Sequence, residues 1–428
     1  MTRKSIPAIA VSAALATSGS MTLAENSTTG PFGFDPIDSS ASSAGWDPAA
    51  PWKIPAGFTQ SVVSDETDLN IYDGGRDDWN DMNTVNETGR KAGRYLYRTH
   101  EVRGVPEGGA VSVVDLQSGA ASVLAQDTSW TALDGIRWTP WKTLVFAEET
   151  AGGRFFEIIL NEDMVTGTVV DRPAVGRLAH EGIDIGPDGA IYVVDEHRGL
   201  SEGCAIGTPC GGGIYKFVPD TRGDLSSGSL YVLRVIDNAD LEGVGQAEWV
   251  GPIDPLNARQ SGSEFGGTSY QRPEDLEIIG STLYVAITEG TRDSSGDQNY
   301  DGRVIAVDLN SMMVTDFVKP GYNVPVEISI PGNPGFQTGF DNPDNLAESP
   351  DGKLIIIEDN VPSDIWFAGK DHDNDGMADG VWLFGSLSDP GAEGTGIYFG
   401  KDPKTLFVNV QHSAADDGDA TWAISPVK

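Results

Sequence analysis

Basic residues are scarce in this sequence. Its 428 residues include 28 Lys and Arg against 64 Asp and Glu, which gives a formal net charge of −36 at pH 7. Such a surface repels nucleic acid and anionic membranes, so neither is expected as a partner. It also repels phosphate and carboxylate substrates unless metal ions reverse the field locally. Scattered acids suit a solvated surface, but a minority recur at a fixed spacing and need another explanation.

Long apolar runs are also lacking. The N-terminal segment has Arg3 and Lys4, then a short apolar run, and then small residues ending at Ala24. This is the pattern of a secretory signal peptide, which predicts cleavage after residue 24. The run is too short and too rich in Ser and Thr to span a membrane. We therefore expect a periplasmic or extracellular protein without a membrane anchor.

Cysteine is nearly absent. The two cysteines, Cys204 and Cys210, lie in the segment CAIGTPC. In an oxidising compartment such a pair predicts a small structural disulfide. A zinc site would need further ligands, and no histidine lies close enough in the sequence to suggest one.

Two nucleotide-binding motifs are missing. There is no G-x-x-x-x-G-K-[ST] loop and no G-x-G-x-x-G segment that opens a helix. Their absence argues against a P-loop enzyme and against a dinucleotide-dependent enzyme.

Acidic residues recur at a fixed spacing around short predicted strand pairs. In each unit a polar or acidic residue opens a strand, a turn follows, and an apolar strand ends at a second acid. The two acids are 15 positions apart (149 − 134 = 15, and likewise for the others). The pairs are Asp134 and Glu149, Glu181 and Glu196, Glu274 and Glu289, and Asp344 and Asp359. A weaker copy joins Asn86 to Glu101, and a half copy ends at His412.

The repeat predicts an all-β protein with the architecture of a β-propeller. Alternating stretches such as AVSVVDL and RVIAVDL are separated by Gly, Asp, Asn and Pro turns, and no stretch has a sustained helical period. Glu101, Glu149 and Glu196 are 48 and 47 residues apart, close to the length of a four-stranded blade. Six blades fit the later spacings most simply, and seven are the alternative. We expect one propeller domain over residues 56–428, preceded by an extended lead-in over residues 25–55.

A propeller would bring the equivalent ends of these hairpins to one mouth of its central channel. Two carboxylates at 4 Å repel one another by about 4 kcal/mol at an effective dielectric constant near 20. Hard oxygen ligands favour Ca²⁺, so the sequence predicts several calcium ions at this mouth. The alternative is that the acids face solvent as turn residues. The predicted ligands are Glu101, Asp134, Glu148, Glu149, Glu181, Glu196, Glu274, Glu289, Asp344 and Asp359.

A second type of calcium site is predicted in the segment DHDNDGMAD. Asp371, Asp373 and Asp375 followed by Gly376 form the D-x-D-x-D-G pattern, in which glycine permits a sharp turn. Asp379 is a further candidate ligand, and the calcium would be structural.

Five of these segments also occur together in a known family. In the order DGIRWTPWKTLVFAEE, HEGIDIGPDGAIYVVDE, RPEDLEIIGSTLYVAITE, DNPDNLAESPDGKLIIIEDN and LFVNVQH, the sequence resembles the PhoX-type alkaline phosphatases over about residues 79–415. The resemblance implies a β-propeller with an axial cluster of calcium and iron that hydrolyses phosphate monoesters outside the cytoplasm. It also implies an arginine that binds the phosphate, Arg272, and four metal ligands: Glu149, Glu181, Glu274 and Asp344.

The sequence departs from that family at three places. Where the family has a cysteine iron ligand, this chain has Ala147, which argues against iron and for calcium alone. The family ending QHPG is QHSA here, so that His412 is retained. The signal segment has Arg3 and Lys4 instead of twin arginines, which predicts general secretion.

These features predict metal-assisted hydrolysis of a small phosphorylated substrate by a secreted monomer. Arg272 would hold the phosphate with two parallel donors, and Glu274 would orient both the arginine and the metal. His412 would protonate the leaving alkoxide or bind metal. An ion pair with Asp275 or a neighbouring acid is the alternative role for Arg272.

Two other functions remain as alternatives. One is another calcium-dependent propeller hydrolase, of lactonase or phytase type, which would not need Arg272. The other is a secreted, calcium-stabilised propeller that binds a partner without catalysis, which the loss of the cysteine at Ala147 would favour.

Overall fold

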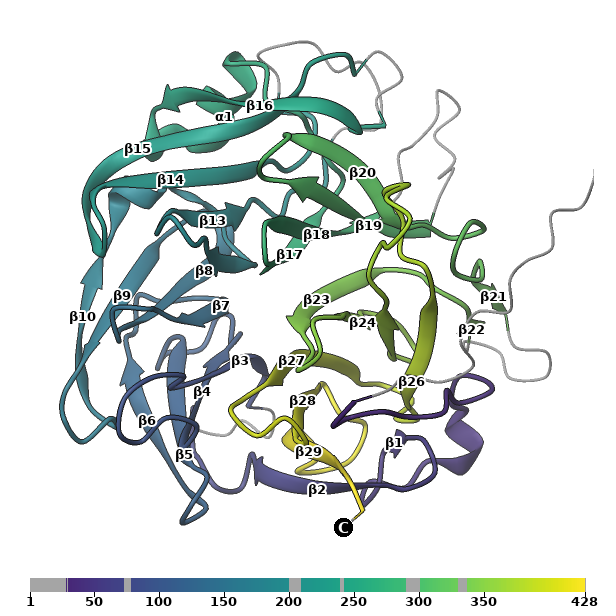
Figure 1. Ribbon diagram of the computed structural model, residues 1–428. Coiled ribbons are helices and arrows are strands. Elements are labelled where there is room, and N and C mark those ends of the chain that lie inside the picture. The colour runs from purple at the N-terminus through teal and green to yellow at the C-terminus, as the bar shows by residue number, and fades with distance from the viewer. Residues whose placement is uncertain are drawn as a thin grey trace, which may run out of the picture.

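The computed structural model describes residues 28, 30–72, 78–199, 209–238, 242–289, 301–329 and 337–427. The described chain is all-β, and its antiparallel strands are arranged around a common axis as in a β-propeller (Figure 1). Both the predicted fold class and the propeller architecture are confirmed. Within the described ranges the α-helical structure is the short α1 (Ala258–Glu264).

The strands form radial sheets, and the strands of each sheet are given in order from the axis outward. One contains β3 (Asn80–Val85), β4 (Tyr95–His100), β5 (Ala110–Asp115) and β6 (Ala120–Gln126). The next contains β7 (Leu133–Trp138), β8 (Leu144–Gly153), β9 (Phe155–Leu160) and β10 (Gly167–Asp171), with β11 (Leu178–Ala179) also paired to β8. Then follow β12 (Ile183–Ile185), β13 (Ile191–Val194), β14 (Ile214–Thr221), β15 (Asp224–Val235) and β16 (Gly245–Ile253).

The second half of the chain repeats this arrangement. One set contains β17 (Pro273–Ile279), β18 (Thr282–Glu289), β19 (Asp301–Asp308) and β20 (Met313–Val318). Another contains β23 (Pro343–Glu348), β24 (Leu354–Glu358), β25 (Asp364–Ala368) and β26 (Val381–Leu387). Because β16 pairs with β20, the strands from β12 to β20 form one nine-stranded sheet. Hydrogen bonding therefore does not divide these strands into separate blades, and the count of six blades stays a prediction.

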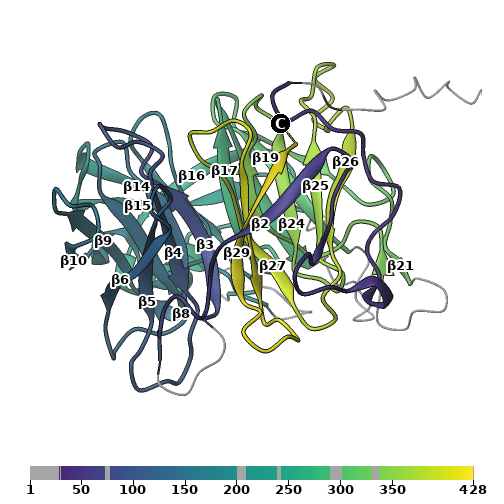
Figure 2. The ribbon, with the colours of Figure 1, turned by 90° about the horizontal axis from the view of Figure 1, so that it is seen from below.

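The first and last strands of the chain close the ring. The last sheet contains β27 (Glu393–Phe399), β28 (Leu406–Gln411) and β29 (Ala420–Pro426), and its outermost strand is β2 (Phe58–Asp65) from the other end of the chain. Figure 2 shows β2 lying beside β29. Because this pairing joins residues more than 350 positions apart, it holds the ring shut as a terminal clasp.

The lead-in before β2 lies against the outer part of the last two sheets. Phe32 and Phe34 pack against Phe367 and Phe384 with ring centroids 4.9–6.1 Å apart, and β1 (Trp52–Lys53) pairs with β26. Burying such aromatic side chains stabilises the fold by about 1.5–3 kcal/mol each. The predicted boundaries of the signal segment and the lead-in stay predictions.

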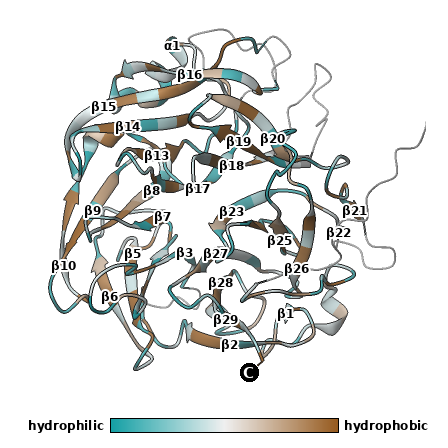
Figure 3. Cartoon of the chain, in the orientation of Figure 1, coloured by the Kyte–Doolittle hydropathy of each residue, from teal (hydrophilic) through white to brown (hydrophobic). Residues whose placement is uncertain are grey.

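Apolar residues fill the space between neighbouring sheets. One such cluster contains Val145 and Phe155 from one sheet and Ile183 and Ile191 from the next. Hydrophobic residues are spread along the sheets, whereas the connecting loops are mostly hydrophilic (Figure 3). No described helix is long and apolar enough to cross a membrane. Cys210 is disulfide-bonded, as predicted, and Cys204 lies outside the described residues.

Candidate metal centre

Four innermost strands begin with the same backbone geometry. In each, a residue with left-handed φ precedes the strand, and an acid follows two positions later. The four residues are Trp79 (φ 46°), Ala132 (φ 48°), Arg272 (φ 50°) and Asn342 (φ 39°). The acids that follow them are Asp81, Asp134, Glu274 and Asp344. A left-handed conformation costs a residue other than glycine about 1–3 kcal/mol, so its repetition marks a feature that the surrounding fold enforces.

One backbone hydrogen bond recurs between each of these strands and its partner strand. A residue within the partner strand, or just after it, donates its N–H to the carbonyl two positions before the acid. The bonds join Glu101 to Trp79 (2.8 Å), Glu149 to Ala132 (2.8 Å), Thr288 to Arg272 (3.0 Å) and Asp359 to Asn342 (3.0 Å). The same bond joins Glu196 to Ala179 (2.8 Å), with Glu181 two positions on. This contact places an outer residue beside an inner acid, as the spacing in the sequence predicts.

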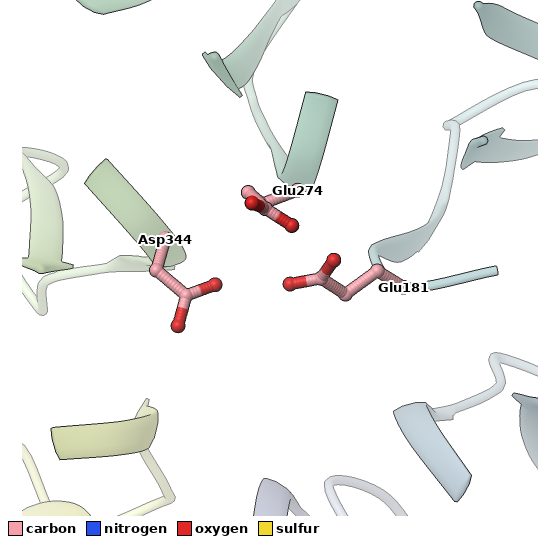
Figure 4. Close-up of side chains that lie close together, drawn as sticks. All are labelled: Glu181, Glu274 and Asp344. Atoms are coloured by element: carbon pink, nitrogen blue, oxygen red, sulfur yellow. The ribbon is translucent and has the colours of Figure 1, made fainter. Parts of the chain in front are cut away.

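Three inner acids converge on one point. Glu181, Glu274 and Asp344 each offer a carboxylate oxygen, and the three oxygens lie within 4.8 Å of one another. Figure 4 shows their carboxylates turned toward a common centre. The three residues are 5 %, 2 % and 8 % exposed. We refer to Glu181, Glu274 and Asp344 as the carboxylate cluster.

Burial and mutual repulsion disfavour ionisation of this cluster. Burial, and next the charge of Glu274, raise the pKa of Glu181 and of Asp344 well above the ordinary values. Burial raises the pKa of Glu274 to about 7, against the opposing effects of a hydrogen bond with Glu181 and of the Arg272 charge. A cation at the centre would reverse this repulsion.

Two more buried acids extend the cluster across the axis. Burial, and next the charge of Asp81, raise the pKa of Asp134 well above its ordinary value, and burial and Glu101 do the same to the pKa of Asp81. Among the described residues, Oδ1 of Asp134 is buried without a hydrogen-bond partner. A buried oxygen in this state is costly unless it binds something further, and a cation is the natural candidate.

The structure corrects the first repeat unit. Asn86 lies at the far end of β3, where its Oδ1 accepts hydrogen bonds from the N–H groups of Arg94 and Tyr95. Asp81 takes the position equivalent to Asp134 instead. The hairpin of β3 and β4 has a longer turn than the others, with Asn80 opposite His100. The fixed spacing of 15 residues therefore predicted the wrong inner partner, Asn86, for Glu101.

The outer residues lie nearer to solvent than the cluster. The side chains of Glu101, Glu149 and Glu196 are 15–16 % exposed. Burial, and next the charge of Glu101, raise the pKa of Glu149 to about 10. We call the face that carries these outer residues the mouth.

Two predicted ligands take other positions. In β18 the backbone bond described above is made by Thr288, so Glu289 lies one residue beyond the equivalent position, and its side chain is outside the described part of the structure. Glu148 is turned away from the mouth: Arg154 Nη2 lies 2.7 Å from its Oε1 and Arg154 Nε lies 2.7 Å from its Oε2. The structure therefore pairs Glu148 with an arginine and does not bring it to the cluster.

Glu393 joins the mouth although its spacing in the sequence did not select it. Burial, and next Asp359, raise its pKa well above the ordinary value. His412 Nε2 lies 3.6 Å from Glu393 Oε1. The ring of His412 also meets the edge of Trp79 at 5.1 Å between centroids. One sequence signal could have identified Glu393. It is an acid at the start of the strand that pairs with the half copy, opposite Gln411.

Arg272 connects the mouth to the cluster. Its Nε donates to Oε1 of Glu196 at 2.6 Å, and its Nη2 lies 2.8 Å from Oε1 of Glu274. Asp275 itself accepts hydrogen bonds from the N–H groups of Leu276 and Leu346. The alternative ion pair predicted for Arg272 is therefore made with the neighbouring acids Glu196 and Glu274. Burial alone would lower the pKa of Arg272, but the charges of Glu274 and Glu196 raise it above its ordinary value. A permanent cation thus lies beside the buried acids.

The second predicted calcium loop is formed far along the chain, between β25 and β26. Oxygens of Asp371, Asp373 and Asp375 lie within 4.8 Å of one another, and Gly376 has the left-handed φ of 93° that the pattern requires. Asp379 does not join them, since its Oδ2 lies 2.6 Å from Nδ1 of His372.

Comparisons with known proteins agree with these observations. The family model described as alkaline phosphatase PhoX matches residues 153–414. No curated protein matches the sequence significantly.

Several solved structures are similar to the chain at low identity. A putative gluconolactonase is 12 % identical, with 87 % of this chain and 93 % of that chain covered, at a TM-score of 0.48. A putative oxidoreductase (glucose dehydrogenase) from Thermus thermophilus is 14 % identical, with 86 % and 100 % covered, at 0.48. The PQQ-bound aldose sugar dehydrogenase from Streptomyces coelicolor is 14 % identical, with 87 % and 99 % covered, at 0.47. These values are too low to bear on activity.

Proposed function

This chain belongs to the PhoX alkaline phosphatase family, and on that premise we propose that it is a calcium-dependent enzyme that releases inorganic phosphate from phosphate monoesters. The observation that supports this most is the contact between Arg272 and Glu274. It places a group that binds anions beside a group of buried acids that favours cations. Phosphoryl transfer needs both, because a phosphate ester cannot approach bare carboxylates.

The donor set fits a hard divalent cation. The carboxylate cluster supplies closely spaced oxygens, and Asp134 adds a buried oxygen that has no hydrogen-bond partner among the described residues. Oxygen ligands of this kind suit calcium. Ala147 lies in the apolar cluster with Val145 and Phe155, so a thiolate ligand is not available there. We therefore favour calcium over iron.

When bound, the cations would neutralise charge on the phosphoryl oxygens and lower the pKa of a nucleophilic water. The protein's own contribution begins with Arg272. Its Nε donates a hydrogen bond to Glu196 and its Nη2 forms an ion pair with Glu274, and its Nη1 and Nη2 would bind the oxygens of a phosphate. An arginine can bind two such oxygens in parallel.

His412 supplies a proton donor at the mouth. Its side chain is 41 % exposed and its Nε2 lies 3.6 Å from Glu393. An imidazole within reach of a leaving oxygen can serve as a general acid, so His412 would donate a proton to the departing alkoxide, which completes the hydrolysis of the ester.

The direct test is phosphate release by the purified protein. We expect turnover of p-nitrophenyl phosphate with calcium, loss of activity with a chelator, and recovery when calcium is returned. Elemental analysis should find calcium without iron. Absence of phosphate release with calcium and also with added iron would refute the proposed activity and leave a calcium-stabilised binding propeller as the better account.

We further propose that the enzyme acts outside the cytoplasm as a monomer on a small substrate. Residues 1–24 lie outside the described ranges, so the signal peptide is tested by N-terminal sequencing of the exported protein. A mature chain that starts near residue 25 is the expected result.

A further inference from the structure

A second arginine, Arg103, lies at the mouth. It follows Glu101 by two positions, and its Nη2 contacts both Oε1 of Glu101 and Oε2 of Glu149. Its Nε lies 2.9 Å from Oε1 of Glu101, and its Nη1 lies 3.4 Å from the carbonyl oxygen of Glu149. Arg103 therefore bridges two neighbouring sheets at the rim.

The two arginines differ in depth. The Arg272 side chain is 21 % exposed and touches Glu274 of the carboxylate cluster. The Arg103 side chain is 46 % exposed and touches the outer residues Glu101 and Glu149. Between the arginines, Glu196 lies close enough to Glu149 that its charge disfavours ionisation of Glu149. Along the mouth the order is thus Arg103, Glu149, Glu196 and Arg272.

This arrangement separates two anion-binding positions. A phosphoryl group held at Arg272 beside the cluster would have its ester oxygen directed away from the cluster. The leaving part of the substrate then lies toward the rim. From this geometry we propose that Arg103 binds a second anionic group, a carboxylate or a phosphate, on the leaving part of the substrate. The proposal rests on the phosphatase function given above.

The negative charge of the protein explains why an arginine at the rim would affect the choice of substrate. The formal net charge is −36, and the outer residues of the mouth are largely acids. A leaving group with its own negative charge meets this field at the rim, whereas a neutral alcohol does not. The side chain of Arg103 is 46 % exposed, so its guanidinium would offset that repulsion where the leaving group lies and offer it a charge-assisted hydrogen bond. Arg103 would thereby set the preference among phosphate esters.

A matched pair of substrates tests this directly. Glycerol 3-phosphate and 3-phosphoglycerate release the same kind of primary alcohol, but only the second carries a carboxylate on the leaving part. The measured quantity is the ratio of kcat/KM for 3-phosphoglycerate to that for glycerol 3-phosphate, with calcium in excess. We expect Arg103→Gln to lower this ratio about tenfold, mainly through a higher KM for 3-phosphoglycerate, as the loss of one charge-assisted contact implies.

Two further variants make the result decisive. Arg103→Lys keeps the charge without the planar fork, so it should give an intermediate ratio, and it serves in place of Arg103→Gln if that variant does not fold. Arg234→Gln is the control, because Arg234 is 40 % exposed, pairs with Glu248 on β16 and is part of a different surface. An unchanged ratio in Arg103→Gln and Arg103→Lys, or an equal loss for both substrates, would overturn the role of Arg103. If the unaltered enzyme releases phosphate from neither substrate nor from p-nitrophenyl phosphate, the proposed phosphatase function itself is what fails.

Discussion

Nη2 of Arg272 lies 2.8 Å from Oε1 of Glu274, so the proposed phosphate-binding group and the proposed metal ligand are in direct contact. The contact has a backbone origin. Arg272 has a left-handed φ of 50°, and its carbonyl accepts a hydrogen bond from Thr288 at 3.0 Å. The turn that directs Glu274 toward the axis therefore also holds the arginine at the mouth.

Replacing Arg272 tests its role in catalysis. We expect Arg272→Ala to lower kcat/KM for p-nitrophenyl phosphate by about 100-fold, because two charge-assisted hydrogen bonds to the phosphate are lost at about 1.5–3 kcal/mol each before compensation. Arg272→Lys should recover only part of the loss, since an ammonium lacks the parallel donors. Steady-state kinetics with elemental analysis measures both effects. Unchanged kinetics in Arg272→Ala, with full calcium content, would show that the arginine is structural.

The pH dependence of stability should change sign with calcium. In the metal-free protein the pKa of Glu274 is raised to about 7 and that of Glu149 to about 10, above their values in the unfolded chain. The folded state then holds more protons, so its stability falls as the pH rises from about 4 through 7 and beyond. We expect the Tm without calcium to be higher at pH 5 than at pH 8.

Calcium should reverse this trend. Calcium binds ionised carboxylates, so protons compete with it more at pH 5 than at pH 8. A ligand that binds the folded state raises the Tm by an amount that grows with the ratio of its concentration to its Kd. The rise in Tm on adding calcium should therefore be larger at pH 8. Thermal melts at both pH values, with calcium and with a chelator, measure it. A calcium effect of the same size at both pH values would contradict the assignment of the buried acids as ligands.

Neutralising one member of the carboxylate cluster should have opposite effects in the two states. Without calcium, Glu181→Gln removes a buried acid whose ionisation the fold disfavours, and it should raise the Tm at pH 8. With calcium it removes a ligand oxygen, and calcium affinity should fall by about tenfold or more, which corresponds to at least about 1.4 kcal/mol. Titration calorimetry and thermal melts give both quantities. Glu248→Gln, at an exposed acid paired with Arg234, should change neither, and a parallel effect in both states would argue against a cation at Glu181.

The sequence predicted the pairing of inner and outer acids because a propeller repeats one backbone unit. Both the spacing and the family resemblance selected Glu181, Glu274 and Asp344, and the structure brings them together. The same rule failed where a turn length changed. Asp81 was missed because the hairpin of β3 and β4 is longer, and Thr288 holds the position that spacing assigned to Glu289.

Other features of the site depend on contacts that spacing does not contain. Arg103 lies at the mouth because two carboxylates from different sheets hold it, and residues 46 positions apart give no such signal in a single sequence. Glu393 is a similar case, since it reaches Asp359 from a separate sheet. Pairwise contacts between sheets, unlike the alternation within a strand, are decided by the closed ring as a whole.

Glu148 and Glu149 are adjacent in the sequence but should respond differently to the same substitution. Arg154 occupies both oxygens of Glu148, which also accepts the N–H of Thr131 at 3.2 Å. Removing one member of a buried ion pair leaves the other charge uncompensated, so Glu148→Gln should lower the free energy of unfolding by about 1–3 kcal/mol. Calcium affinity should stay the same, because these oxygens already bind the arginine.

Glu149→Gln should instead weaken calcium binding. It should leave the metal-free protein at least as stable at pH 8, since the pKa of Glu149 is raised by burial and by neighbouring acids. Denaturant unfolding with a chelator, together with calcium titration of both variants, separates the two roles. Loss of calcium affinity in Glu148→Gln would return that residue to the metal centre.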